Sequence, residues 1–231
     1  MMTRRWAIGI LGIAAAALLV GRDIIFPAKY RFRMTVEVET PEGIRRGSSV
    51  MEIRSSKEPF RIGNSHSLKN ELIGEAVAVD MSRGTLFALI TNTKSGQPLM
   101  DVVTYSLIER SKREISFWNA VKELGRSDHI GRQVELVPDQ YPMFVRFRDI
   151  KDPKSVEQIK VEDIQTSFGS EIALRRITLQ VTDGSVTNII YRYLPWIDEF
   201  DDKMLDGSKI NNSQNLSNTL SKVSFQQGFA R

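Results

Sequence analysis

The chain has 231 residues, of which 41% are hydrophobic, 26% are charged and none is cysteine, so disulfides, thiolate metal sites and a cysteine nucleophile are excluded. The formal net charge is +4, but residues 1–33 hold six Lys or Arg and one Asp, and the remaining 26 basic and 27 acidic residues give a net charge of −1. The chain beyond residue 33 is therefore not the basic domain that a nucleic-acid backbone requires, and no nucleic-acid partner is expected.

The N-terminal segment has the order of an export signal or a membrane anchor. Arg4 and Arg5 precede residues 6–20, which carry neither a charge nor a hydroxyl group. A helix continued to Phe26 is about 31 Å long, close to the roughly 30 Å hydrocarbon core of a bilayer. No A-x-A-like cleavage site follows the apolar run, which favours an uncleaved anchor over residues 1–28. A cleaved signal peptide is the alternative.

This segment predicts the location of the protein. An export signal leaves the N-terminus inside, so we expect a single-pass protein of the bacterial inner membrane with the bulk of the chain in the periplasm. Secretion to the periplasm after cleavage is the alternative. A count of flanking cations alone favours the opposite orientation, because Arg22, Lys29, Arg31 and Arg33 follow the apolar run.

The region 29–202 predicts a β-rich extracytoplasmic domain that begins with hairpins. Residues 30–39 alternate between apolar and polar side chains, which is typical of a half-buried strand, and the turn at 40–43 leads into a returning strand. Residues 73–80 and 85–91 flank a short turn ending in glycine and predict a second hairpin. Strands with one buried face are typical of antiparallel sheets.

A helical insertion is expected near residues 98–124, where apolar residues recur at helical spacing. We expect one long or two shorter helices, with a break in the charged stretch 109–114. Gly125 stands where a helix C-terminal cap belongs.

Strand patterns return after the insertion. The expected strands cover residues 132–137, 143–148, 172–182 and 189–194, with a helical turn over 161–168 closed by Gly169. The apolar phase slips at Arg175 and Arg176, which indicates a β-bulge.

The remaining residues, 203–231, are dominated by Ser, Asn and Gln and predict a polar, flexible tail. The expected fold class is α+β: mainly antiparallel β, sandwich-like or a partly open barrel, with a helical insertion and one preceding N-terminal membrane helix.

Three carboxylates are candidates for binding a hard cation. Asp149 and Asp152 flank a turn, and Asp183 stands in a later turn. The spacing lacks the alternating acidic residues and central glycine of an EF-hand, so the favoured interpretation is that Asp149 and Asp152 cap the turn around Pro153. No catalytic residue, metal ligand or cofactor is assigned.

An apolar group precedes the tail and is a candidate partner contact. Trp196, Ile197 and Phe200 follow Pro195 at the edge of the predicted domain. Apolar side chains that are exposed together often mark a protein interface. Packing in the core is the alternative.

A resemblance supports the membrane association. Residues 141–196 read YPMFVRFRDIKDPKSVEQ…FG…RRITLQVTDGSVTN…LPW. This stretch resembles a family of membrane-anchored bacterial proteins, found mainly in alphaproteobacteria, with the run P-x-F-V-R-F-x-D…D-P-x-S-V-E…F-G…R-I-T…T-D…V-T…L-P-W. The matching positions are Pro142, Phe144, Arg146, Phe147, Asp149, Asp152, Pro153, Ser155, Val156, Glu157, Phe168, Gly169, Thr182, Asp183, Pro195 and Trp196. The resemblance implies a membrane-associated protein and carries no activity.

The leading functional hypothesis is a membrane-tethered extracytoplasmic binding or scaffolding module that is not an enzyme, with the membrane and an envelope protein as partners. One alternative is an envelope hydrolase that uses carboxylates or a metal ion. A second alternative is a carrier of a small apolar ligand inside the sandwich or barrel.

Overall fold

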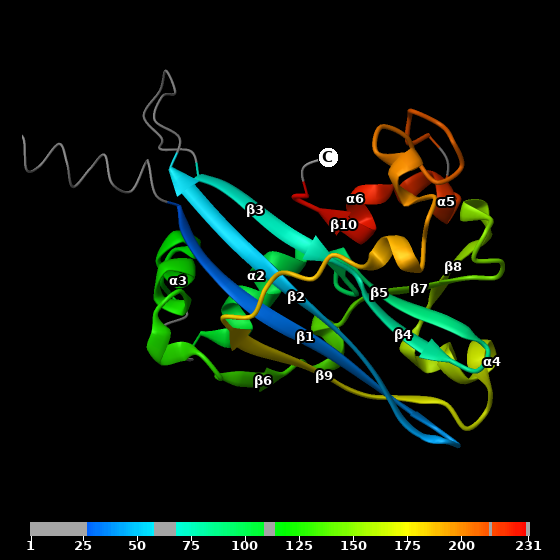
Figure 1. Cartoon of the computed structure of the whole chain (residues 1–231), viewed down its shortest axis with the longest axis horizontal. Coiled ribbons are helices and arrows are strands. Elements are labelled where there is room, and N and C mark those ends of the chain that lie inside the picture. Colours follow the sequence, from blue (N-terminus) through cyan, green and yellow to red (C-terminus); the bar gives the residue numbers. More distant parts are fainter. Residues whose placement is uncertain (1–26, 58–67, 109–113, 213, 230–231) are drawn as a thin grey trace, which may run out of the picture.

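The computed structural model describes residues 27–57, 68–108, 114–212 and 214–229. Two open, antiparallel sheets form the body of the molecule, with a few helices, as the α+β prediction requires (Figure 1). The first sheet has the order β10 (Gln226–Gln227), β3 (Leu68–Glu75), β2 (Gly43–Lys57), β1 (Ala28–Thr40), β9 (Ala173–Thr182) and β6 (Gln133–Glu135). The second has the order β4 (Val77–Met81), β5 (Gly84–Thr93), β7 (Pro142–Phe147) and β8 (Val156–Ile159).

The helical elements are short. The α-helices are α2 (Leu99–Leu107), α3 (Phe117–Leu124), α4 (Ile164–Phe168), α5 (Leu216–Thr219) and α6 (Lys222–Phe225). The 3₁₀ turns are η2 (Ser127–His129), η3 (Pro138–Gln140), η4 (Pro153–Ser155), η5 (Val161–Asp163), η6 (Ile190–Arg192) and η7 (Ile197–Phe200). Within the described part of the chain, no helix combines the length and the apolar character that crossing a membrane requires. The predicted anchor falls mostly on residues 1–26, which lie outside the described residues.

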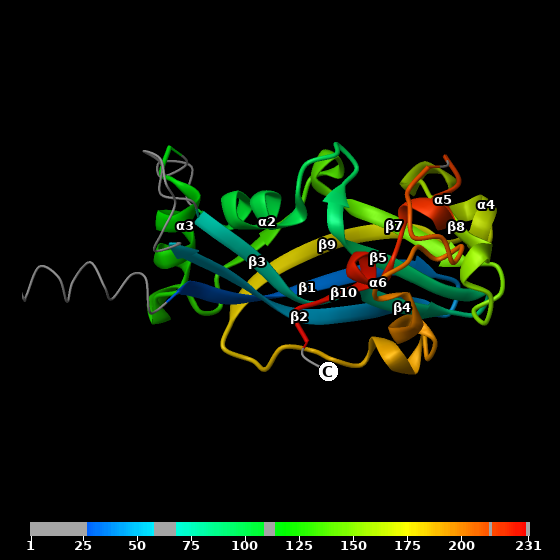
Figure 2. The ribbon, with the colours of Figure 1, turned by 90° about the horizontal axis from the view of Figure 1, so that it is seen from above.

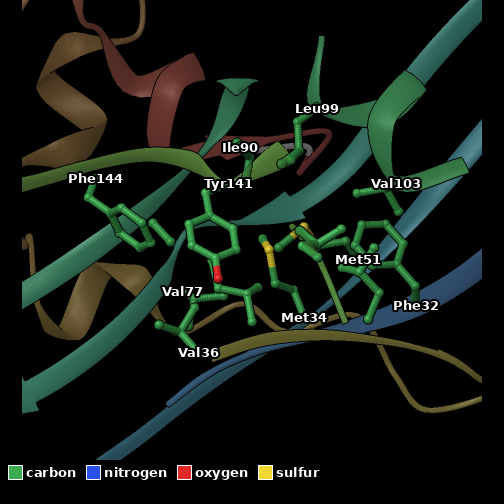
Figure 3. Packing of buried hydrophobic residues seen from close by; sticks show 14 of the residues in the cluster. Phe32, Met34, Val36, Met51, Val77, Ile90, Leu99, Val103, Tyr141 and Phe144 are labelled. Carbon is green, nitrogen blue, oxygen red and sulfur yellow. The ribbon is translucent and has the colours of Figure 1, made fainter. Parts of the chain in front are cut away.

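The first core lies between the two sheets and beneath α2 and α3. Alternate residues of β1 point into it, and Phe32, Met34 and Val36 are each 0% exposed. Figure 3 shows these side chains meeting Met51 of β2 and side chains of β5, β7 and α2. The alternation in residues 30–39 therefore has the predicted physical cause, the burial of one face of a long strand.

A second core lies on the other face of the second sheet. Leu86 and Ala88 of β5 face the first core, whereas Phe87 and Leu89 face the second. Because β5 is covered on both sides, its sequence is a continuous apolar run and does not alternate. Phe225 of α6 completes the second core from the C-terminal segment.

Several local predictions are confirmed. The insertion forms two helices, α2 and α3, and Ser116 caps α3 by accepting a hydrogen bond from Asn119 N. The register between β1 and β9 shifts after Glu37, which pairs with Arg176, because Val38 pairs with Leu174. The predicted bulge is therefore present.

Two predictions are wrong. Residues 189–194 do not form a strand: the backbone N–H groups of Ile189 and Ile190 bond the buried Glu75 carboxylate, and the chain turns into η6. The segment after residue 203 is not a free tail over its described part, because it carries α5, α6 and β10 and buries Leu205 and Leu220 in the second core.

The face of the first sheet that points away from the first core is polar, and we call it the outer face. A segment that we call the strap (residues 183–189) crosses it in front of β1 and β2 (Figure 1), on the side opposite α2 and α3 (Figure 2). Thr187 N donates to Val50 O at 2.9 Å, and Val50 N donates to Thr187 Oγ1 at 2.9 Å. The strap therefore pairs with the part of β2 that lies beyond the end of β3.

Two carboxylates on the outer face are buried between arginines. Glu52 is 1% exposed and accepts hydrogen bonds from Arg31 Nε at 2.7 Å and from Arg54 Nε. Burial raises the pKa of Glu52, but these hydrogen bonds outweigh it and leave the pKa below its usual value. The hydrogen bond from Arg176 at 2.8 Å likewise lowers the pKa of Glu37.

The lowered pKa of Glu37 predicts a pH-dependent contribution to stability. A folded-state pKa below the unfolded value of about 4.3 gives a contribution that is present above that pH and lost as the pH falls through the folded pKa. We expect Glu37→Gln to lower the free energy of unfolding by about 1 kcal/mol at neutral pH, since the arginines are partly solvated. Urea unfolding of both proteins between pH 7 and pH 3 measures this difference, which should shrink toward zero at the acid end. A difference that grows as the pH falls would contradict the assignment.

A hollow beside helix α2

A hollow of about 440 Å³ lies beside α2. It is lined by Gln97, Pro98, Asp101, Val102, Tyr105, Ser106 and Gln140. All but Gln140 come from α2 or the residues just before it, and Gln140 comes from η3. The hollow therefore depends on one helix face and one turn.

The helix presents this face because its other face is fixed in the first core. Leu99, Val103 and Leu107 recur at intervals of four residues and are 0–1% exposed. Asp101 and Tyr105 are also four residues apart, so they lie one turn apart on a different side of the helix. Both side chains are partly exposed at the hollow.

Three polar side chains at the hollow have no hydrogen-bond partner within the described chain. Asp101 and the Tyr105 hydroxyl make no hydrogen bond to another described residue, and Ser106 Oγ is buried without one. Thr104 on the same helix differs, because its hydroxyl donates to Met100 O at 2.7 Å and contacts Tyr30 Oη at 3.0 Å. Most buried polar groups in proteins are paired, so the unpaired Ser106 Oγ, together with the partly exposed Asp101 carboxylate and Tyr105 hydroxyl, makes the hollow a candidate ligand site.

The electrostatics of the hollow centre on Asp101. Burial raises the pKa of the Asp101 carboxyl, and burial together with the charge of Asp101 raises the pKa of the Tyr105 hydroxyl. Gln140 accepts a hydrogen bond from Val137 N through Oε1 at 3.1 Å, which leaves its amide N–H groups as donors. The hollow thus offers the Asp101 carboxylate, the Tyr105 hydroxyl and the Gln140 amide donors, with the buried Ser106 hydroxyl in its lining.

A second, smaller groove of about 170 Å³ lies between the strap and β4. Its most buried charged side chain is Glu75, which is 2% exposed. Glu75 Oε2 accepts from Ile189 N at 2.8 Å and from Ile190 N at 2.9 Å, and Oε1 accepts from Ile189 N at 2.9 Å. Both oxygens are therefore used to hold the strap, and this carboxylate is a structural anchor.

The three carboxylates predicted from the sequence do not form a cation site. Asp149 Oδ1 accepts from Lys151 N and Asp152 Oδ1 accepts from Lys154 N, each at 2.9 Å, so both aspartates cap the turn around η4. Asp183 directly follows β9, and its carbonyl oxygen accepts from Arg31. The described residues contain no cluster of three His, Cys, Asp or Glu placed to hold a metal ion.

The predicted partner contact is part of the second core. Ile197 and Phe200 are 1% and 8% exposed, which leaves little of either side chain for a partner. Trp196 is partly buried, packs edge-on against Phe147 at 5.3 Å, and donates from Nε1 to Ile150 O at 2.8 Å. These contacts correct the interpretation of the group as an exposed patch, because the C-terminal segment folds back over it.

Sequence reasoning did not single out Asp101, Tyr105 or Ser106. Their positions on a predicted helix, away from its apolar stripe, were visible in the sequence. A polar helix face is ordinarily exposed to solvent, and only the placement of η3 beside α2 turns this face into a hollow.

Comparison of the chain with protein-family models, with curated protein sequences and with solved structures finds no match.

Proposed function

We propose that this chain is a membrane-tethered extracytoplasmic module that binds a small, hydroxyl-rich ligand, such as a saccharide, in the hollow beside α2. The observation that carries the proposal is the convergence of unpaired polar groups from Asp101, Tyr105 and Ser106 on one hollow. The N-terminal apolar segment supports the tether, because β1 begins at Ala28, immediately after it. In this proposal the N-terminal segment is a membrane helix.

The chemistry of the lining favours hydroxyl groups in the ligand. A hydroxyl both donates and accepts, so it can satisfy a carboxylate, a phenol and an amide with one type of group. The Tyr105 ring, which packs edge-on against Phe117 at 6.2 Å, adds an apolar surface for the C–H face of a sugar ring. The carboxylate of Asp101 selects against an anionic ligand, because like charges repel.

A hydrolase is the second candidate, and the same hollow is where it would act. General acid–base cleavage uses two groups with different protonation states. Among the described lining residues Asp101 is the one carboxylate, and none is histidine. Binding therefore explains the present groups with fewer assumptions.

The carrier of an apolar ligand has less support. Its site would lie between the sheets, and Figure 3 shows that region filled with packed side chains of both sheets and α2.

The test compares three related sugars on the full-length protein in detergent. Saturation-transfer NMR with glucosamine, glucose and glucuronate should give decreasing affinity in that order, because Asp101 attracts the cation and repels the anion. Asp101→Asn should remove this order and weaken glucosamine binding about tenfold or more, the effect of losing a hydrogen bond to a charged group. Asp202→Asn is the matched control, since Asp202 is exposed and pairs only with the exposed Lys209 at 3.6 Å.

Two outcomes contradict the proposal. One is the absence of saturation transfer from the wild-type protein to any of the three sugars. The other is an unchanged order of affinities in Asp101→Asn. Release of a cleaved product from a disaccharide substrate, lost in Asp101→Asn, would favour the hydrolase.

A further inference from the structure

One end of the molecule gathers the elements closest to the N-terminal segment. The start of β1, the end of β2, the start of β3 and helix α3 all lie at this end (Figure 1). Ala28 pairs with Ser55, and Lys57 pairs with Leu68, which places these strand ends side by side. This end is the first part of the described domain to follow residues 1–26.

The turn after α3 is packed directly on the first residues of β1. A Cβ atom built on Gly125 would lie 2.4 Å from Lys29 O, so only glycine permits this approach without a shift of the backbone. Gly131 N donates to Val181 O and Val181 N donates to Arg132 O, each at 2.9 Å. The turn 125–132 is thus held beside the point where the chain enters the domain.

The length of the connection limits how far this turn can lie from a bilayer. Lys29 is three residues after Phe26, the last residue of the apolar segment. Three residues of fully extended chain span at most about 11 Å. If residues 6–26 cross the membrane, the turn lies at or near the layer of lipid headgroups.

The surface of this end carries the groups that bind an anionic interface. We call it the basal surface; among the described residues its charged side chains include Lys29, Arg31, Lys57, Lys122, Arg126, Arg132, Glu52, Glu123, Asp128 and Asp183. Six of these residues are cations and four are carboxylates; Glu52 pairs with Arg31, Asp128 with Arg126 and Glu123 with His129. Two apolar side chains are exposed on the same surface, Ile130 at 49% and Leu68 at 39%.

We infer that the basal surface rests on an anionic lipid bilayer, with Ile130 at the membrane interface and the lysines and arginines among the headgroups. This inference rests on the proposed tether. Each Lys or Arg near an anionic surface adds to the attraction, so a few such contacts hold a tethered domain in one orientation. An exposed isoleucine flanked by cations is the side-chain pattern of interfacial membrane contacts.

The orientation places the hollow beside α2 relative to the membrane. Helix α2 packs beside α3 over the first sheet, and both lie on the side opposite the strap (Figure 2). A domain that rests on its basal surface therefore holds the hollow at a fixed height and angle, whereas a domain joined only by a flexible connection does not.

The experiment uses the absence of cysteine from the chain, which permits labelling at a single introduced position. The full-length protein carries an environment-sensitive fluorophore on Ile130→Cys and is placed in nanodiscs that contain phosphatidylglycerol and a lipid quencher at the headgroup. The matched control carries the label on Ile210→Cys, in the segment before α5, where Ile210 is 67% exposed. Helix α5 lies at the other end of the molecule from α3 (Figure 1). We expect blue-shifted, quenched emission at position 130 and neither effect at position 210.

Three further conditions test whether the contact depends on charge. Nanodiscs of phosphatidylcholine alone, or about 1 M salt with its Debye length of roughly 3 Å, should relieve the quenching at position 130. The triple variant Lys29→Glu, Lys122→Glu and Arg126→Glu should do the same. Unquenched emission at position 130 in the anionic discs, or equal quenching at 130 and 210, overturns the inference.

A separate label distinguishes failure of the tether. Ile13→Cys lies in the apolar segment, and a quencher deep in the acyl chains should quench a label there if that segment enters the bilayer. Quenching at position 13 without quenching at position 130 supports the tether but contradicts the contact between the basal surface and the bilayer. Absence of quenching at position 13 contradicts the proposed tether.

Discussion

Replacing Phe225 with alanine is expected to lower the free energy of unfolding by about 3–5 kcal/mol, the usual cost of removing a buried phenylalanine side chain. Phe225 is 0% exposed, and its ring lies 6.1 Å from Phe87 and 5.9 Å from Phe147. The variant loses these ring contacts and leaves a cavity beneath α6. At roughly 2–4 °C per kcal/mol, the melting temperature should fall by about 6–20 °C.

Val223→Ala is the matched control on the same helix, because Val223 is 49% exposed. It should change stability by no more than about 0.5 kcal/mol. Differential scanning calorimetry of the three proteins measures the effects directly. In a free tail, neither substitution would change the melting temperature. Equal melting temperatures for wild type and Phe225→Ala would therefore contradict the packed C-terminal segment.

The second large effect is expected at Glu75, where Glu75→Ala should cost about 2–4 kcal/mol. The substitution leaves the N–H groups of Ile189 and Ile190 buried without an acceptor, and each unsatisfied buried donor costs about 1–3 kcal/mol. Because these bonds hold the strap, amide hydrogen exchange should rise first at Thr187, Ile189 and Ile190. Glu71→Ala is the control on the same strand, since Glu71 pairs only at the surface, with Lys69.

The pH dependence at Glu75 should have the opposite sign to that at Glu37. Burial raises the pKa of Glu75, and the hydrogen bonds from Ile190 and Ile189 offset this only in part. A folded-state pKa above the unfolded value gives a contribution that is fully present below the unfolded pKa and lost as the pH rises through the folded pKa. The stability difference between wild type and Glu75→Ala should therefore grow between pH 7 and pH 4. A difference that shrinks over this range would show that the carboxylate is favoured in its charged form.

The local patterns of the sequence were sufficient where burial is one-sided. The alternation in residues 30–39 predicted β1 because one face of that strand packs against the first core and the other faces solvent. The phase slip at Arg175 predicted the bulge in β9 for the same reason, since each side chain must keep its face when the register moves.

The same patterns failed where distant groups decide the conformation. Residues 189–194 have strand-forming composition, yet Glu75, more than a hundred positions away, accepts their N–H groups and turns the chain into η6. The apolar residues of the C-terminal segment are few and set among Ser, Asn and Gln, so composition predicted disorder. Those few are large side chains that pack against the apolar face of the second sheet. The free energy gained by burying them is enough to order the segment despite the polar residues between them.

The candidate site, too, could be predicted from the sequence only in part. The sequence by itself determined that helices with an apolar stripe form within residues 98–124. Only the tertiary structure decided that η3 lies beside α2, that Asp101, Tyr105 and Ser106 remain unpaired around one hollow, and that the turn after α3 packs on Lys29. The physical reason is that sequence periodicity indicates which face of a helix or strand is buried. A site depends on which polar groups from separate elements come close together, and this has no periodic pattern in the sequence.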